Sequence, residues 1–333
     1  MMKVAINGFG RIGRVVFRII EEDKDLEVVA INDLTDARQL AYLLKYDTNH
    51  RRYEQEISYE DDYLIVNGRK IKVFACTDPK EIPWGEVGAD VVFECTGRFT
   101  NYDDAHKHIE AGAKKVIISA PAKGNIKTIV YNVNNEILDG SEEVISAASC
   151  TTNCLAPVVD LLNKNFGIES GFMTTVHAYT NDQVILDVTH KKGIDSRRGR
   201  AGAANIVPSS TGAASAIGEV IPSLKGKLDG SAMRVPVSDG SVVDLTLCLN
   251  KHVTVDEINK CFLDNQNETI KITMDPIVSS DILGMSVGSL VDGLSTKVLN
   301  VGDKQLVKVV SWYDNEYGYS SQMVRTAKYL LKK

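Results

Sequence analysis

Cys150 is the residue whose neighbours best suit it to act as a nucleophile. It lies in the run SCTTNC at 149–154, between a predicted strand at 144–147 and a helical pattern of apolar residues at 155–162. The first turn of a helix has unpaired N–H groups and a positive dipole, and both favour a thiolate over a thiol. A single cysteine, taken alone, is more often a small buried apolar residue. Cys150 therefore needs partners, whereas Cys154, one turn further along, is predicted to be in the core.

His177 is the candidate acid/base partner of that cysteine. It closes a predicted strand at 172–177, and the chain has only six histidines. Most histidines are surface or hydrogen-bonded core residues, so this position alone does not assign a role. A cysteine–histidine pair needs proximity in space and not in sequence. We therefore predict that Cys150 and His177 meet in the fold.

Two further segments suit an anionic ligand. Arg234 lies in the otherwise apolar segment 233–236. Burying a guanidinium group without a partner costs several kcal/mol, so Arg234 is expected to form an ion pair or to bind an anion. The run SSTG at 209–212 precedes a helical pattern, where hydroxyl and N–H groups suit an anion, although a plain N-cap explains them equally well. The basic stretch at 187–204, taken alone, is a solvated loop or a subunit contact.

The N-terminal segment carries a dinucleotide-binding pattern. A short apolar strand at 4–6 is followed by NGFGRIG at 7–13 and then by a helical pattern. Gly8 allows the tight turn, Gly10 lets the backbone approach a pyrophosphate, and Gly13 allows close packing of helix on strand. Asp33 ends the second strand, about twenty residues after the last glycine, where an acidic side chain binds ribose hydroxyls and repels a 2′-phosphate. The pattern predicts NAD in preference to NADP.

The remaining periodicity predicts an α/β chain. Strands are expected at 91–93, 116–119, 242–249 and 307–312, helices at 36–44, 103–111 and 255–263, a hairpin around Asn67-Gly68, and a terminal helix after 313–319. Thr96 comes just after one buried strand and Ser119 ends another, and they would line the ligand crevice at the carboxyl edge of a parallel sheet. An ordinary polar loop position explains each of them about as well.

Bulk composition limits the possible functions. The 333 residues are long enough for two domains, and 44% are hydrophobic and 25% charged. A net charge of −6 gives no general attraction for nucleic acid or anionic membranes. The six cysteines have neither disulfide-framework nor zinc-site spacing, so no metal is expected. The chain enters its first strand without a leader-like segment, which is typical of a cytoplasmic protein.

Together these segments resemble the phosphorylating glyceraldehyde-3-phosphate dehydrogenase family. The matching runs follow the family's order along essentially the whole chain: INGFGRIG at 6–13, LLKYD at 43–47, ISAPAK at 118–123, ASCTTNC at 148–154, HAYTNDQ at 177–183, STGAA at 210–214, MRVP at 233–236 and WYDNEYGY at 312–319. The resemblance implies a Rossmann-type doubly wound parallel sheet at 1–149, with the C-terminal helix 315–333 packing back onto it. It also implies an α+β catalytic domain at 150–314 with a mainly antiparallel sheet.

The resemblance implies a role for each matching residue. Cys150 attacks the aldehyde of glyceraldehyde 3-phosphate, and His177 is the acid/base. The substrate's phosphate is held by Arg234, Thr180 and Asp182. Attacking inorganic phosphate is held by Ser149, Thr151, Thr211 and Gly212. Contacts to NAD come from Gly8, Gly10, Arg11, Ile12, Gly13, Asp33, Thr96, Ser119 and Asn315. The family is typically homotetrameric, and the segment from about 182 to 204, which includes the basic stretch, matches its long interface loop.

The sequence departs from the family pattern at three places. The link after His190 is longer here, at 191–196; Thr189 stands where strictly NAD-dependent members usually carry proline; and Ser215 replaces a common lysine. A hydroxyl at 189 could tolerate some NADP, and nothing physical accounts for Ser215. Two alternatives stay open at this point: a relative acting on another phosphorylated aldehyde, such as erythrose 4-phosphate, and a non-catalytic NAD-binding interaction protein.

Overall fold

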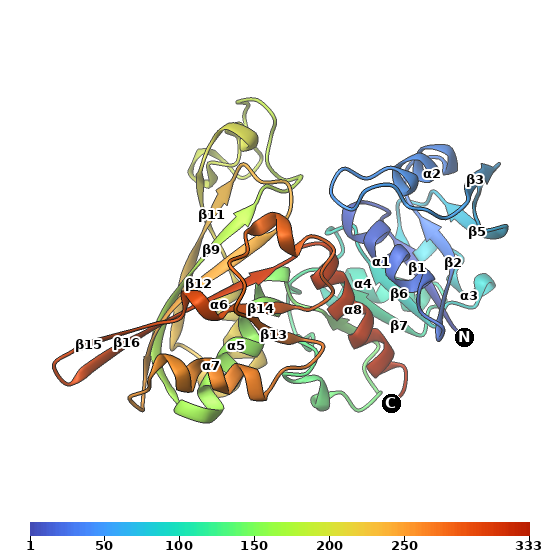
Figure 1. Cartoon of the computed structure of the whole chain (residues 1–333). Coiled ribbons are helices and arrows are strands. Elements are labelled where there is room, and N and C mark those ends of the chain that lie inside the picture. Colours follow the sequence, from blue (N-terminus) through green and yellow to red (C-terminus); the bar gives the residue numbers. More distant parts are fainter. The chain divides into compact units, whose positions relative to one another are not determined.

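The computed structural model describes all residues from 1 to 333, which form two compact units. The first comprises Met1–Tyr131, Asn135–Ser149 and Ser320–Lys333, and the second comprises Asn132–Asn134 and Cys150–Tyr319. Each unit is built on one eight-stranded sheet (Figure 1). All six cysteines are free thiols. None of the helices combines the length and the apolar character that a membrane crossing requires.

The sheet of the first unit is mainly parallel. Its strands are β1 (Met2–Asn7), β2 (Leu26–Asn32), β3 (Ile57–Glu60), β4 (Tyr63–Val66), β5 (Arg69–Phe74), β6 (Val91–Glu94), β7 (Lys115–Ile118) and β8 (Val144–Ser146). They lie in the order β3-β4-β5-β2-β1-β6-β7-β8, and every neighbouring pair from β5 to β8 is parallel. The chain order reverses between β1 and β6, which creates an opening at the carboxyl ends of these strands. The predicted doubly wound sheet is confirmed.

Local sequence explains the edge of this sheet. Strands β4 and β5 form the predicted antiparallel hairpin, with Val66 paired to Arg69. Asn67 and Gly68 between them have φ values of 51° and 77°. A two-residue turn with positive φ at both positions matches the twist of the flanking strands, and asparagine followed by glycine tolerates it best.

Helices cover the sheet of the first unit. They are α1 (Arg11–Glu21), α2 (Ala37–Lys45), α3 (Trp84–Val87), α4 (Tyr102–Glu110) and the C-terminal part of α8 (Tyr317–Leu330). The side chain of Asp36 caps α2 by accepting from the N–H of Gln39 at 2.8 Å. The apolar stripe of α8, which includes Met323, Ala327 and Leu330, belongs to the buried core of this unit. The last helix of the chain therefore completes the core that the first strands begin.

The sheet of the second unit is mainly antiparallel. Its strands are β9 (Ile168–Ala178), β10 (Val207–Ser210), β11 (Leu228–Val235), β12 (Ser241–Leu249), β13 (Ile270–Thr273), β14 (Ser289–Asp292), β15 (Lys297–Val301) and β16 (Lys304–Tyr313). The order is β10-β11-β9-β12-β16-β14-β13, with β15 paired to β16. Only the pairs β9–β11 and β13–β14 are parallel. This confirms the predicted α+β architecture with a mainly antiparallel sheet.

Three α-helices belong to the second unit: α5 (Cys150–Phe166), α6 (Ala213–Val220) and α7 (Val255–Asp264). Residues Leu155, Val159 and Leu162 of α5 are fully or almost fully buried, as the apolar spacing predicts. Helix α7 begins with a capping box, in which Thr254 and Glu257 each bond the other's backbone N–H. Because α5 is long and well buried, its first turn is held in a fixed place.

Candidate active site and cofactor pocket

A glycine-rich turn joins β1 to α1 in the first unit. Gly8 has φ of 89°, and a Cβ there would lie 2.8 Å from the backbone nitrogen of Thr96. A Cβ on Gly13 would lie 2.2 Å from the carbonyl oxygen of Gly8, so only glycine allows α1 to pack this closely. A Cβ on Gly10 would meet nothing within 4 Å, and no side chain caps the helix that starts after it. The turn is thus open on the side where α1 presents its first N–H groups.

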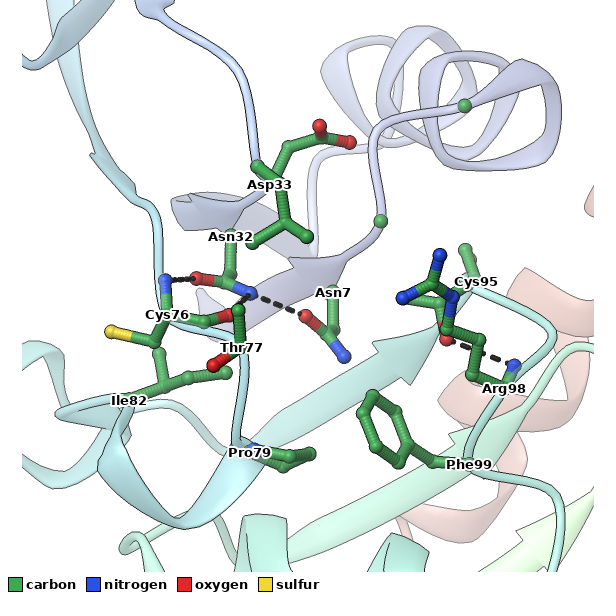
Figure 2. Close-up of a pocket in the computed structure, with 14 residues that line it drawn as sticks. Asn7, Asn32, Asp33, Cys76, Thr77, Pro79, Ile82, Cys95, Arg98 and Phe99 are labelled. Carbon is green, nitrogen blue, oxygen red and sulfur yellow. Dashed lines mark hydrogen bonds between the residues drawn. The ribbon is translucent and has the colours of Figure 1, made fainter.

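A pocket of about 330 Å³ lies at the switch point of the sheet (Figure 2). Its lining comes from the ends of β1, β2 and β6 and from the loops after β5 and β6: Asn7, Gly8, Gly10, Asn32, Asp33, Leu34, Cys76, Thr77, Pro79, Ile82, Cys95, Thr96, Arg98 and Phe99. Four residues predicted to bind the cofactor, Gly8, Gly10, Asp33 and Thr96, are among them. An apolar slot with a few convergent polar groups is the usual form of such a site.

Asp33 closes the turn and also faces the pocket. Its Oδ2 accepts from the N–H of Phe9 at 2.7 Å, which ties the end of β2 to the glycine-rich turn. The other carboxylate oxygen makes no hydrogen bond within the chain, which leaves it for the hydroxyl groups of a ligand. An open glycine turn, a helix N-terminus and a carboxylate at this spacing fit the diphosphate and the adenosine ribose of a dinucleotide.

Arg11, the first residue of α1, forms a bidentate ion pair with Asp47. The Nη1–Oδ2 distance is 2.5 Å and the Nη2–Oδ1 distance is 3.0 Å. Asp47 also accepts from the backbone amides of Asn49 and His50, both at 2.9 Å. Burial raises the pKa of Asp47, but the hydrogen bonds from Arg11 and His50 outweigh it and bring the pKa to about 2. This ion pair fixes the Arg11 side chain. The contact of Arg11 with a ligand would therefore come from its backbone N–H at the N-terminus of α1.

We expect the Arg11–Asp47 pair to make stability depend on pH in the acid range. The pKa of Asp47 is lowered on folding from an unfolded value of about 3.9, so its contribution of about 2 kcal/mol is present above about pH 4 and is lost as the pH falls toward 2. Asp47→Asn should lower the free energy of unfolding by about that amount at neutral pH, and the difference should shrink in acid. Urea denaturation at several pH values measures it. The exposed Asp303→Asn is the control, and equal stability of wild type and Asp47→Asn at neutral pH would contradict the assignment.

Cys150 begins α5 in the second unit, directly after the turn that follows β8. Ala148 in that turn has φ of 58°, a left-handed conformation that few non-glycine residues adopt. The Sγ atom of Cys150 lies 3.5 Å from Nε2 of His177, which is near the end of β9. The sequence predicts that these two residues meet, and the structure brings them together. A nucleophile in contact with a base is the basic unit of covalent catalysis.

His177 is held in one orientation by its other ring nitrogen. Nδ1 lies 2.7 Å from the carbonyl oxygen of Ala178, which can only accept, and 2.7 Å from Nη1 of Arg234, which can only donate, so these contacts hold the ring in place but are compatible with either tautomer. Burial and the nearby charge of Arg234 lower the pKa of His177 to about 3, so the imidazole is neutral at physiological pH. In the tautomer that donates from Nδ1 to Ala178, the lone pair of Nε2 faces Sγ of Cys150 and can take the proton of the thiol.

Arg234 lies beside His177 because β11 and β9 pair in parallel with these two residues in register. Its Nη1 donates to the carbonyl oxygen of Ala178 at 2.9 Å and to Oγ1 of Thr180 at 3.3 Å. Its Nε atom is buried and has no hydrogen-bond partner. A buried N–H of a cation without a partner is costly, and an anion would satisfy it.

A second arginine, Arg198, lies in the same cluster as Arg234 and Thr180. Thr180 donates to Oδ1 of Asp182 at 2.5 Å, and Asp182 also pairs with the guanidinium of Arg198. The sequence assigns Arg198 no individual role, since Arg198 lies in a basic run that could equally be a solvated loop. The carboxylate of Asp182 accepts these hydrogen bonds, and it thereby orients the side chains of Thr180 and Arg198.

Tyr313 is another residue whose contacts the sequence does not predict. Its hydroxyl group lies 2.9 Å from Oγ1 of Thr151 and 2.7 Å from Oγ1 of Thr175, and its ring packs edge-on against His177. Burial raises the pKa of Tyr313 well above its ordinary value, so the hydroxyl remains neutral. The only signal in the sequence is its place at the end of a predicted strand, within the family-like run at 312–319.

The electrostatics of Cys150 differ from those expected of a helix N-terminus alone. Burial raises the pKa of the Cys150 thiol, while the charge of Arg234 and the hydrogen bonds at Thr151 act against that rise. Desolvation penalises a thiolate more than the first turn of α5 compensates. The resting pair is then a thiol beside a neutral imidazole, and the proton moves when the sulfur attacks.

The other predicted site residues lie on separate elements. Thr211 and Gly212 precede α6, where Oγ1 of Thr211 accepts from the N–H of Ala213 at 3.2 Å, as a simple cap would. Ser119 follows β7, and its N–H donates to the carbonyl oxygen of Glu94 at 3.0 Å. Asn315 is in the second unit, where its Oδ1 accepts from Ser241 at 2.7 Å.

Comparison with known proteins gives one consistent family. A family model described as "Glyceraldehyde 3-phosphate dehydrogenase, NAD binding domain" matches residues 2–102, and one described as "Glyceraldehyde 3-phosphate dehydrogenase, C-terminal domain" matches residues 149–315. The chain is 60% identical over 332 residues to glyceraldehyde-3-phosphate dehydrogenase of Clostridium pasteurianum and 58% identical over 332 residues to that of Clostridium acetobutylicum. It is 56% identical over 333 residues to that of Streptococcus pyogenes. Each comparison covers 100% of this chain and 99% of the relative.

Proposed function

The chain belongs to the glyceraldehyde 3-phosphate dehydrogenase family, and from this premise we propose that it oxidises D-glyceraldehyde 3-phosphate with NAD and inorganic phosphate to 1,3-bisphosphoglycerate. The observation that carries the proposal is the contact of 3.5 Å between Sγ of Cys150 and Nε2 of His177 at the start of a buried helix. The reaction belongs to glycolysis and gluconeogenesis. The identities of 56–60% over the full length support this substrate over other phosphorylated aldehydes.

Covalent catalysis follows from the contact of Cys150 with His177. The sulfur forms a bond to the aldehyde carbon while Nε2 of His177 takes the thiol proton and returns it to the new alkoxide, which gives a thiohemiacetal. NAD, when bound, supplies the acceptor for the hydride that leaves this carbon. His177 removes the hydroxyl proton as the thioester forms. An oxygen of inorganic phosphate then attacks the thioester carbonyl, and the thiolate of Cys150 leaves.

The phosphate group of the substrate fits the cluster around Arg234. Its buried Nε has no partner within the chain, and Nη1 already holds Thr180. We assign the direct contacts to Arg234 and Thr180, with Asp182 orienting Thr180. The attacking inorganic phosphate is assigned to Ser149, Thr151, Thr211 and Gly212, whose hydroxyl and N–H groups lie at the starts of α5 and α6.

The first unit supplies the NAD site in this proposal. The turn at Gly8, Gly10 and Gly13 and the N–H groups of Arg11 and Ile12 hold the diphosphate, and Asp33 holds the adenosine ribose. Thr96, Ser119 and Asn315 complete the contacts. Residues 1–149 and 315–333 then form the NAD-binding domain and residues 150–314 the catalytic domain. We further propose a cytoplasmic homotetramer in which the basic stretch at 182–204 lies at a subunit interface.

Cofactor choice gives a testable expectation. Asp33 carries a negative charge where the 2′-phosphate of NADP would bind, so kcat/KM for NAD should exceed that for NADP by more than about tenfold, equivalent to about 1.4 kcal/mol. Asp33→Asn keeps an oxygen for the N–H of Phe9 but removes the charge, and it should narrow this ratio. Thr189→Pro, which restores the family residue, should widen it if the hydroxyl admits NADP. A ratio below tenfold in the wild type would contradict the preference.

Steady-state kinetics with two aldehydes test the substrate. We expect a much higher kcat/KM for glyceraldehyde 3-phosphate than for erythrose 4-phosphate. The reverse order would make the protein a related dehydrogenase with the same chemistry. Inactivation by one equivalent of a thiol alkylator, with protection by the aldehyde, separates a catalyst from a non-catalytic NAD-binding protein.

A further inference from the structure

A second polar network is buried next to the cofactor pocket, and the mechanism above gives it no role. Its centre is Glu94, the last residue of β6, with His108 from α4 and Trp84 from α3; all three side chains are inaccessible to solvent. Nε1 of Trp84 donates to Nδ1 of His108 at 2.9 Å, and Nε2 of His108 lies 3.1 Å from Oε2 of Glu94. An indole N–H can only donate, so Nδ1 is the acceptor and Nε2 carries the proton that Glu94 accepts.

Glu94 also binds two residues that line the pocket. Its Oε2 accepts from Nδ2 of Asn7 at 2.5 Å, and its Oε1 accepts from the N–H of Thr96 at 2.8 Å and from the Thr96 hydroxyl. Together with His108, this makes four donors around one side chain. A carboxylate that accepts so many hydrogen bonds can be buried without a cation. The charge of Glu94 therefore decides which way each surrounding group points.

The carboxylate of Glu94 also sets the direction of the hydrogen bonds between the side chains along the floor of the pocket. Because Nδ2 of Asn7 faces Glu94, its Oδ1 faces Asn32, whose Nδ2 donates to it at 2.8 Å (Figure 2). Oδ1 of Asn32 in turn accepts from the N–H of Cys76 at 2.9 Å. A side-chain amide has two orientations of nearly equal shape, and the carboxylate permits only one of them. This series of hydrogen bonds runs across the ends of β6, β1 and β2, which are neighbouring parallel strands.

The same network supports an aromatic wall. Phe99 lines the pocket, and its ring packs edge-to-face on the ring of His108, with centroids 6.3 Å apart and planes at 90°. Fixing His108 between Trp84 and Glu94 thus also fixes Phe99. Three lining residues, Asn7, Thr96 and Phe99, depend on a side chain that does not itself line the pocket.

We propose that Glu94 is a positioning residue for dinucleotide binding, acting through Asn7, Thr96 and Phe99. The inference rests on the proposed use of NAD. A preorganised pocket binds without first ordering its own side chains, and that ordering otherwise weakens affinity. Loss of the Glu94 charge should therefore weaken NAD binding and leave the chemistry at Cys150 unchanged.

Glu94→Gln tests this directly. Glutamine has the same shape, but its amide nitrogen would face donors that the carboxylate now satisfies. We expect the Kd for NAD, measured by titration calorimetry, and the KM for NAD to rise at least about tenfold. The kcat at saturating NAD and the KM for glyceraldehyde 3-phosphate should stay within about twofold of wild type. Glu86→Gln makes the same chemical change at an exposed position of α3 and should alter none of these values.

Trp84→Phe is the second variant, and it carries the test if Glu94→Gln does not fold. This substitution keeps an aromatic ring but removes the N–H that fixes the tautomer of His108. The KM for NAD should therefore rise severalfold, with kcat unchanged. Lower thermal stability with an unchanged Kd for NAD in both variants would overturn the proposal, since the network would then serve only the core. A wild-type protein that does not bind NAD would instead refute the proposed function.

Discussion

Replacing Cys150 with serine is expected to lower kcat for NADH formation by roughly 10⁴-fold or more, with the fold intact. A serine hydroxyl next to His177 is a far weaker nucleophile toward an aldehyde, and its ester would not conserve the oxidation energy as a thioester does. Steady-state rates with glyceraldehyde 3-phosphate, NAD and phosphate measure the loss, and circular dichroism checks the fold. A variant that kept a tenth of wild-type activity would rule out covalent catalysis by Cys150.

Cys154→Ser is the matched control on the same helix. Cys154 is fully buried, and its Sγ lies 3.6 Å from Oγ of Ser289 and 3.7 Å from the carbonyl oxygen of Ser311. Burial raises the pKa of Cys154 to about 12, so its thiol stays protonated and unreactive. We expect this variant to lose some stability and to retain most of its activity.

His177→Asn is expected to lower kcat by about 10²- to 10⁴-fold while the KM for NAD changes little. The imidazole is neutral because burial and Arg234 lower its pKa to about 3, so it serves as the proton acceptor throughout the physiological range. The variant should also be alkylated at Cys150 more slowly, since the thiol loses its base. Rapid-mixing measurement of NADH formation separates the hydride step from later ones.

The exposed His252→Asn is the control for this substitution, and its kcat should match that of wild type. A His177→Asn variant that forms NADH at the wild-type rate would show that another group accepts the proton. Faster alkylation of Cys150 in that variant would show that His177 raises the barrier to thiolate formation, opposite to the role assigned here.

Much of the fold could be predicted because local patterns determine it. The spacing of Gly8, Gly10 and Gly13 predicted α1, and Asn67 followed by Gly68 predicted the hairpin of β4 and β5. The short strand β10 was not predicted: its sequence VPSS has a proline and no apolar alternation, and it forms only because β11 offers a partner edge. The parallel pair β9–β11 likewise depends on how distant segments pack.

The candidate site divides in the same way. Cys150 was visible because it stands between a strand and a helix, and Asp33 because of its distance from the glycines. The contact of Arg234 with His177 was not visible, since 57 residues separate them and only the register of β9 with β11 brings them together. The contacts of Tyr313 with Thr151 and Thr175 join residues that are 162 and 138 positions apart. Glu94 and His108 are only 14 positions apart, but they lie on a strand and a helix whose packing the sequence does not specify. Contacts between side chains on different elements have no characteristic spacing in the sequence, so sequence patterns do not reveal them.

The dependence of NADH formation on inorganic phosphate tests the central claim most directly. The rate with glyceraldehyde 3-phosphate and NAD is measured with and without phosphate, beyond the first turnover. If a thioester on Cys150 is resolved by phosphate bound near Thr151 and Thr211, sustained turnover requires phosphate and stops after about one equivalent of NADH per site without it. Sustained turnover at the same rate without phosphate would mean that water resolves the thioester, and it would contradict the account.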